Sequence, residues 1–80
     1  MHKKKLNKWT ILLNRYRFMH GYSMESLAQK VNLTTANYFE IEKCNRGRPK
    51  YETFLGLSLE MGMTIEELQK IYYESYIPKN

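Results

Sequence analysis

The chain has 80 residues, which is enough for one small domain, and we expect no second, ligand-sensing domain. Its hydrophobic and charged fractions, 42% and 26%, are close to globular averages and argue against wholesale disorder, while the single cysteine excludes an internal disulfide. The net charge of +5 is concentrated in two basic blocks, residues 1–20 and 43–50, whereas residues 51–80 are net acidic, an asymmetry that favours a polyanionic partner on one face.

The chain begins with a basic segment, and we expect residues 1–6 to form an N-terminal arm that is frayed in the absence of DNA. Helical periodicity then predicts a helix over about 7–19. Gly21 can take the positive φ that ends such a helix. The apolar stripe of this helix consists of Trp9, Leu12, Leu13 and Tyr16, with Phe18 as a further candidate.

The next segment predicts two short helices joined by a tight turn. Ser23 is a natural N-cap for a helix over about 24–31, and Thr34 caps a second helix over about 35–43. Asn32, between them, tolerates a left-handed conformation. Two helices of about eight residues joined in this way cross steeply, which is the helix-turn-helix geometry. The crossing and its angle require small or apolar residues, and the chain supplies Leu27, Ala28, Val31, Leu33 and Ile41.

A polar loop rich in arginine, called here the basic loop, follows at residues 44–50, and a fourth helix is predicted over about 51–61. Thr64 and Glu67 have the spacing of a capping box, so a fifth helix begins there. No segment shows the alternation of a strand. The predicted fold is therefore all-α, a compact five-helix bundle in which the helix-turn-helix domain spans residues 7–72 and residues 73–80 form a C-terminal tail with a possible dimer contact.

Together these motifs resemble the phage repressor/Cro-like (XRE) helix-turn-helix family of transcriptional regulators. The resemblance implies a five-helix, lambda-repressor-like domain that binds operator DNA as a homodimer. It also implies that Arg17 and Glu42 form a structural ion pair. The motifs that carry it are Leu13, Arg17, Gly21, Tyr22, Ser23, Leu27, Ala28, Leu33, Thr34, Ile41, Glu42, Lys43, Glu52, Thr53, Phe54, Leu55, Met61, Gly62, Glu67 and Leu68.

The helix over 35–43 is the candidate recognition helix, with Tyr38 and Ile41 pointing inward. Small and apolar residues on its outward face suit contacts with thymine methyl groups in a major groove. We expect base contacts from Thr35, Ala36, Phe39 and Glu40. Two alternatives remain: a rotated register that partly buries Phe39, and a Glu40 that repels phosphates rather than accepting from cytosine.

Polar and basic residues around this helix are the candidates for phosphate contacts, which position a protein on DNA without reading its sequence. The alternative is a basic loop that is merely solvated. The candidates are Thr34, Asn37, Lys43, Asn45, Arg46, Arg48 and Lys50.

Apolar and aromatic residues in the C-terminal half predict a homodimer interface. A glycine inside a helix is costly, and a closely packed partner would explain it. The candidates are Gly56, Leu59, Tyr72, Tyr73, Tyr76 and Ile77. The alternative is that Tyr72 and Tyr76 fold back on their own subunit.

The sequence contains no nucleophile–base pair, glycine-rich phosphate loop or metal-ligand spacing, so we expect no enzyme, cofactor, metal or small-molecule ligand. No apolar run approaches the roughly 20 residues of a membrane span, and we expect a cytoplasmic protein of a bacterial cell or a phage-infected host. The predicted function is a sequence-specific, repressor-type transcriptional regulator that binds double-stranded DNA as a homodimer. The alternatives are a protein-binding module on the same fold, such as an antitoxin or inhibitor, and a nonspecific nucleic-acid binder.

Overall fold

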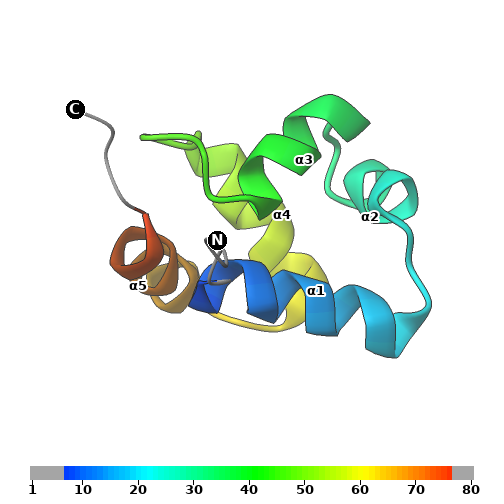
Figure 1. Cartoon of the computed structure of the whole chain (residues 1–80), viewed down its shortest axis with the longest axis horizontal. Coiled ribbons are helices and arrows are strands. Elements are labelled where there is room, and N and C mark those ends of the chain that lie inside the picture. The colour runs from blue at the N-terminus through cyan, green and yellow to red at the C-terminus, as the bar shows by residue number, and fades with distance from the viewer. Residues whose placement is uncertain (1–6, 77–80) are drawn as a thin grey trace, which may run out of the picture.

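The computed structural model describes residues 7–76, and in that range it contains five α-helices and no strand (Figure 1). The predicted all-α, five-helix fold is confirmed, with helix bounds within about one residue of those expected. The predicted arm at 1–6 and the end of the predicted tail, including Ile77, lie outside the described residues. The helices are α1 (Lys8–His20), α2 (Met24–Lys30), α3 (Thr35–Glu42), α4 (Tyr51–Met61) and α5 (Ile65–Ser75).

The helices pack so that α3 lies along one edge of the molecule. α2 packs on α3, α1 packs on both α3 and α5, and α4 packs on α5. In Figure 1, α3 is at the top and α1 runs along the opposite edge, so α3 keeps one long side free of other helices. Within residues 7–76 no helix combines the length and the apolar character that a membrane crossing requires.

Side-chain caps stabilise the start of every helix except α4. The Ser23 side chain accepts a hydrogen bond from a backbone N–H at the start of α2, and Thr34 does the same for α3. Thr64 and Glu67 form the predicted capping box at the start of α5. Gly21 has a φ of 68° and ends α1, as expected.

The core forms around Trp9, whose ring meets Phe54 and Tyr72 edge-on at centroid distances of 6.1 and 4.9 Å. It joins residues from all five helices, and it therefore fixes α3 against the remainder of the bundle. The buried apolar residues are Trp9, Leu13, Leu27, Ala28, Val31, Tyr38, Ile41, Cys44, Phe54, Leu57, Leu68 and Tyr72.

Two positions depart from the predicted stripes. Phe18 is 88% exposed, because five residues of helix turn it about 140° from the buried Leu13. On α4 the sequence predicts one face made of Phe54, Leu55, Ser58 and Met61, but Leu55 is 37% exposed, and Leu57, three residues after Phe54, is fully buried in its place. Periodicity thus located both helices but misplaced one edge of each apolar stripe.

The left-handed backbone of Asn32, in the turn between α2 and α3, leads to a prediction about stability. Asn32 is exposed and has a φ of 61°. We expect Asn32→Ala to lower the free energy of unfolding by about 1 kcal/mol, because a Cβ without a compensating polar group is unfavourable there. Asn32→Gly, which has no such penalty, is expected to leave it unchanged. Urea denaturation of both variants measures this, and equal stabilities would contradict the left-handed turn.

Candidate nucleic-acid interface

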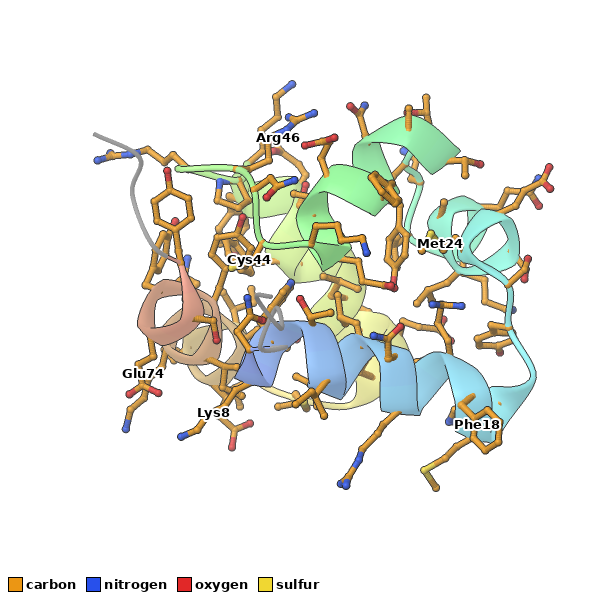
Figure 2. All side chains as sticks on the ribbon, viewed as in Figure 1. Lys8, Phe18, Met24, Cys44, Arg46 and Glu74 are labelled. Carbon is orange, nitrogen blue, oxygen red and sulfur yellow. The ribbon has the colours of Figure 1, made fainter. Side chains whose placement is uncertain are left out.

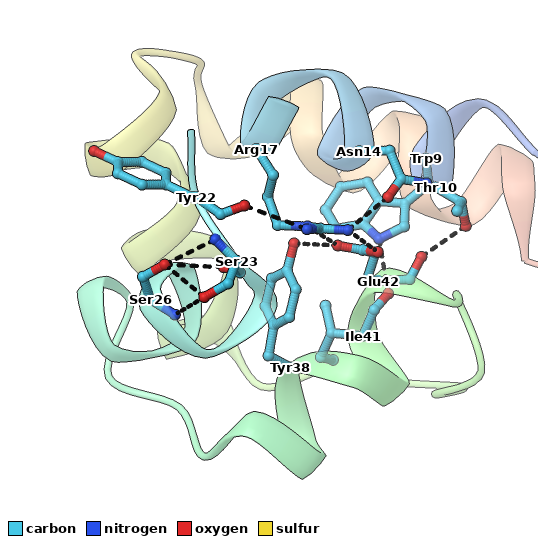
Figure 3. A network of polar contacts seen from close by, with 10 residues as sticks. All are labelled: Trp9, Thr10, Asn14, Arg17, Tyr22, Ser23, Ser26, Tyr38, Ile41 and Glu42. Atoms are coloured by element: carbon cyan, nitrogen blue, oxygen red, sulfur yellow. Dashed lines mark hydrogen bonds and ion pairs between the residues drawn. The ribbon is translucent and has the colours of Figure 1, made fainter. Parts of the chain in front are cut away.

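A buried polar network holds α3 against α1 (Figure 3). Arg17 forks onto the Glu42 carboxylate, with Nε donating to Oε1 at 2.8 Å and Nη2 to Oε2 at 3.1 Å. The Tyr38 hydroxyl donates to the same Oε1 at 2.5 Å. Only 2% of Glu42 is exposed, so these donors replace the water that the carboxylate has lost. The expected Arg17–Glu42 ion pair is confirmed.

Two further side chains of α1 bind the C-terminal end of α3. The Trp9 indole N–H donates to the Ile41 carbonyl at 2.8 Å, and the Thr10 hydroxyl donates to the Glu42 carbonyl at 2.6 Å. The last carbonyls of a helix have no partner within it, and these donors supply one. The end of α3 is therefore fixed by side chains, whereas its outward face is left free.

The outward face of α3 has the predicted register. Thr35 and Ala36 are exposed, Phe39 is 40% exposed and Glu40 is half-buried. Tyr38 and Ile41 are buried on the opposite side. Because Tyr38 and Ile41 face inward, the register is not rotated, but Phe39 is partly buried, as the alternative expected.

Two side-chain contacts join the outward face to the basic loop, and a third lies at the end of α3. Arg46 Nη2 donates to Asn37 Oδ1 at 2.9 Å, and Asn45 donates to Glu40 at 3.3 Å. The Lys43 ammonium lies 5.2 Å from the centroid of the Phe39 ring, a cation–π distance. Arg46 lies at the same edge of the molecule as α3, away from Phe18 (Figure 2).

The predicted base and phosphate contacts therefore form one surface, called here the α3 surface. Its phosphate candidates are all exposed. The members that the structure brings together are Thr34, Thr35, Ala36, Asn37, Phe39, Glu40, Lys43, Asn45 and Arg46, with Arg48 and Lys50 further along the basic loop.

The structure corrects two of the predicted dimer contacts. Tyr72 is fully buried, and its hydroxyl binds the backbone of Arg46, so it folds back on its own chain. Gly56 packs against α2: a Cβ there would lie 3.2 Å from the Val31 carbonyl oxygen, which explains the glycine without a partner. Leu59 and Tyr73 are exposed and stay candidates, while Tyr76 is half-buried and stacks on Tyr72.

Sequence reasoning missed three residues that position the α3 surface: Trp9, Thr10 and Tyr72. Trp9 was expected only as core, and nothing in the local sequence marks its indole N–H as a partner for Ile41, 32 residues away. Thr10 and Tyr72 likewise act over long separations. The only hint in the sequence is that these residues carry a polar group, an indole N–H or a hydroxyl, within or beside a predicted apolar stripe.

Burial shifts the acid–base behaviour of this network. Burial and the adjacent Glu42 carboxylate raise the pKa of the Tyr38 hydroxyl above its ordinary value. Burial likewise raises the pKa of Tyr72 and of the Cys44 thiol. The hydroxyls of Tyr38 and Tyr72 therefore keep their protons to higher pH than an exposed tyrosine would.

Among residues 7–76 no group of three or more His, Cys, Asp or Glu side chains is arranged to hold a metal ion. Comparisons of the chain with models of known families, with curated proteins and with solved structures found no match. What the α3 surface binds is therefore inferred from its own residues.

The ion pair generates a prediction about stability. Arg17→Met leaves a buried carboxylate without its cation, and we expect the free energy of unfolding to fall by about 3 kcal/mol. Arg15→Met, an exposed arginine on the same helix, is the control and is expected to change it by less than about 0.5 kcal/mol. Chemical denaturation of the two variants compares them, and equal losses would contradict a structural role for the pair.

The buried tyrosines generate a prediction about alkaline stability. Above the ordinary tyrosine pKa of 10.0 the unfolded chain releases protons that folded Tyr38 retains, so the free energy of unfolding falls as pH rises. Each retained proton contributes a slope of about 1.4 kcal/mol per pH unit. We expect Tyr38→Phe to reduce this slope, as measured by denaturation between about pH 10 and 11. Parallel curves for wild type and variant would rule the explanation out.

Proposed function

We propose that this protein is a sequence-specific DNA-binding transcriptional regulator, with α3 entering the major groove. The observation that carries the proposal is the outward face of α3, where Thr35, Ala36 and Phe39 are exposed although the helix is firmly held on its other side. A major groove is wide enough for one α-helix, and small or apolar side chains suit its thymine methyl groups.

The charge around α3 supports the same function. Lys43 and Arg46 border the outward face, and Arg48 and Lys50 extend the basic block along the loop. Phosphate contacts of this kind fix the register of a protein on a duplex. Glu40 is the acidic residue within this surface, where it accepts a hydrogen bond from Asn45, whereas Glu74, on α5, lies away from Arg46 (Figure 2).

A repressor-type protein of this size would act as a cytoplasmic homodimer that reads two half-sites about 34–36 Å apart. Of the predicted dimer contacts, Leu59 on α4 and Tyr73 on α5 are exposed and offer apolar surface for such a dimer. Sedimentation tests the dimer. A protein that stays monomeric at high micromolar concentration, both free and on DNA, is not this kind of regulator.

Selection from randomised duplex oligonucleotides tests sequence specificity. We expect one enriched site, and we expect Thr35→Ala and Phe39→Ala to bind it more weakly by about 1–3 kcal/mol each, because a base contact is lost. Both side chains are outside the core, so thermal unfolding followed by circular dichroism is expected to change little. A selection that enriches no site would make the protein a nonspecific binder and contradict the proposal.

Salt dependence tests the phosphate contacts. The slope of log affinity against log salt is expected to fall by about one unit in Arg46→Ala and in Arg48→Ala, since each loses one phosphate contact. Arg15→Ala, which removes the same charge from α1, serves as the matched control and is expected to keep the wild-type slope. If all three variants lower the slope equally, the change comes from the lower net charge of the protein, and the basic loop makes no specific phosphate contact.

A second function, a protein-binding module, is supported by one different observation. Phe18 and Met19, at the end of α1, are 88% and 79% exposed, and Arg15 lies beside them. Large exposed apolar side chains gathered at one place are typical of protein contacts. Weak binding of the wild type to any duplex, with little salt dependence, would favour this function over DNA binding.

A further inference from the structure

One residue of α5 binds the backbone of the basic loop from inside the protein. The Tyr72 hydroxyl accepts a hydrogen bond from the Arg46 N–H at 3.0 Å and donates to the Arg46 carbonyl at 2.5 Å. A tyrosine hydroxyl can do both at once, and so one side chain satisfies both backbone groups of Arg46. The ring of Tyr72 is fully buried among Trp9 and Phe54, which fixes the position of the hydroxyl.

Two further contacts hold the basic loop against the C-terminal end of α5. Cys44, where the loop leaves α3, has a left-handed backbone with a φ of 61°, and its thiol donates to the Tyr72 carbonyl at 3.6 Å. Gly47 lies against the side chain of Tyr76, the residue after α5: a Cβ on Gly47 would be 3.1 Å from the Tyr76 hydroxyl oxygen. The first half of the basic loop, residues 44–47, therefore packs against the C-terminal end of α5 and the residue that follows it.

The side chain of Arg46 contacts α3 rather than α5. While the Arg46 backbone is held by Tyr72, its guanidinium donates to Asn37 on α3. Arg46 thus bridges the buried end of α5 and the exposed face of α3. Any movement of its backbone moves a charge at the edge of the α3 surface.

We propose that Tyr72 is a positioning residue for DNA binding: its hydroxyl sets the basic loop so that Arg46 meets a phosphate beside α3. This rests on the proposed function. It makes DNA affinity depend on α5, a helix whose buried tyrosine contacts no DNA.

Tyr72→Phe removes the hydroxyl and keeps the ring, and Tyr73→Phe on the exposed neighbour is the matched control. Off DNA, we expect the Arg46 amide of the wild type to exchange its hydrogen more slowly than the amides of Gly47 and Arg48 further along the loop, and at least about tenfold faster in Tyr72→Phe than in the wild type. Tyr73→Phe is expected to match the wild type. Unprotected exchange at Arg46 in the wild type overturns the proposal even if Tyr72→Phe does not fold.

On DNA, Tyr72→Phe is expected to bind about five- to tenfold more weakly, the effect of one lost hydrogen-bonded anchor. It should also lower the salt slope, which a purely structural loss of stability would leave unchanged. Adding Arg46→Ala to Tyr72→Phe should weaken binding no further than Arg46→Ala alone, because both act through one contact.

The two arms separate failure of this inference from failure of the proposed function. Fast exchange in Tyr72→Phe together with unchanged affinity and slope overturns the positioning role and leaves DNA binding intact. A wild type that binds no DNA overturns the proposed function and the positioning role with it, while the exchange data still show whether Tyr72 holds the loop.

Discussion

The arrangement of the molecule depends on one buried carboxylate. Glu42, at the end of α3, is 2% exposed and must be paired, and its partners come from α1 and from α3 itself. A buried ion pair adds little net stability compared with an apolar contact, but it is very costly to leave half-made. We infer that the pair restricts the angle at which α3 can dock on α1. With that angle set, Trp9 and Thr10 reach the last carbonyls of α3, and the outward face is directed away from the bundle.

Much of the fold could be predicted because its signals are local. Each helix start with a side-chain cap, such as Ser23 or Thr64, is decided by residues within one turn, and so its position follows from the sequence alone. The register of α3 was also predictable, since Tyr38 and Ile41, three residues apart, define one buried side and leave the other to solvent.

The parts that could not be predicted are those decided by distant residues. A tyrosine near the end of a chain looks the same whether it faces a partner or its own loop. Tyr72 faces a backbone 26 residues earlier, and no short-range pattern encodes that separation. The prediction for Gly56 was wrong for the same reason: the group that excludes a side chain there is the carbonyl of Val31, 25 residues earlier in the chain, just after α2. Local sequence thus defined the α3 surface, but not what holds the basic loop beside it.

Trp9 gives this molecule an internal optical reporter. It is the sole tryptophan of the chain, it is fully buried, its indole N–H is bonded to the end of α3, and its ring touches Tyr72 of α5. Its fluorescence emission therefore senses whether α3 and α5 are both docked, without a label. Since the outward face of α3 lies on the other side of that helix, a ligand there leaves the indole unquenched by direct contact. A change in emission on binding would consequently report rearrangement inside the bundle rather than contact at its surface.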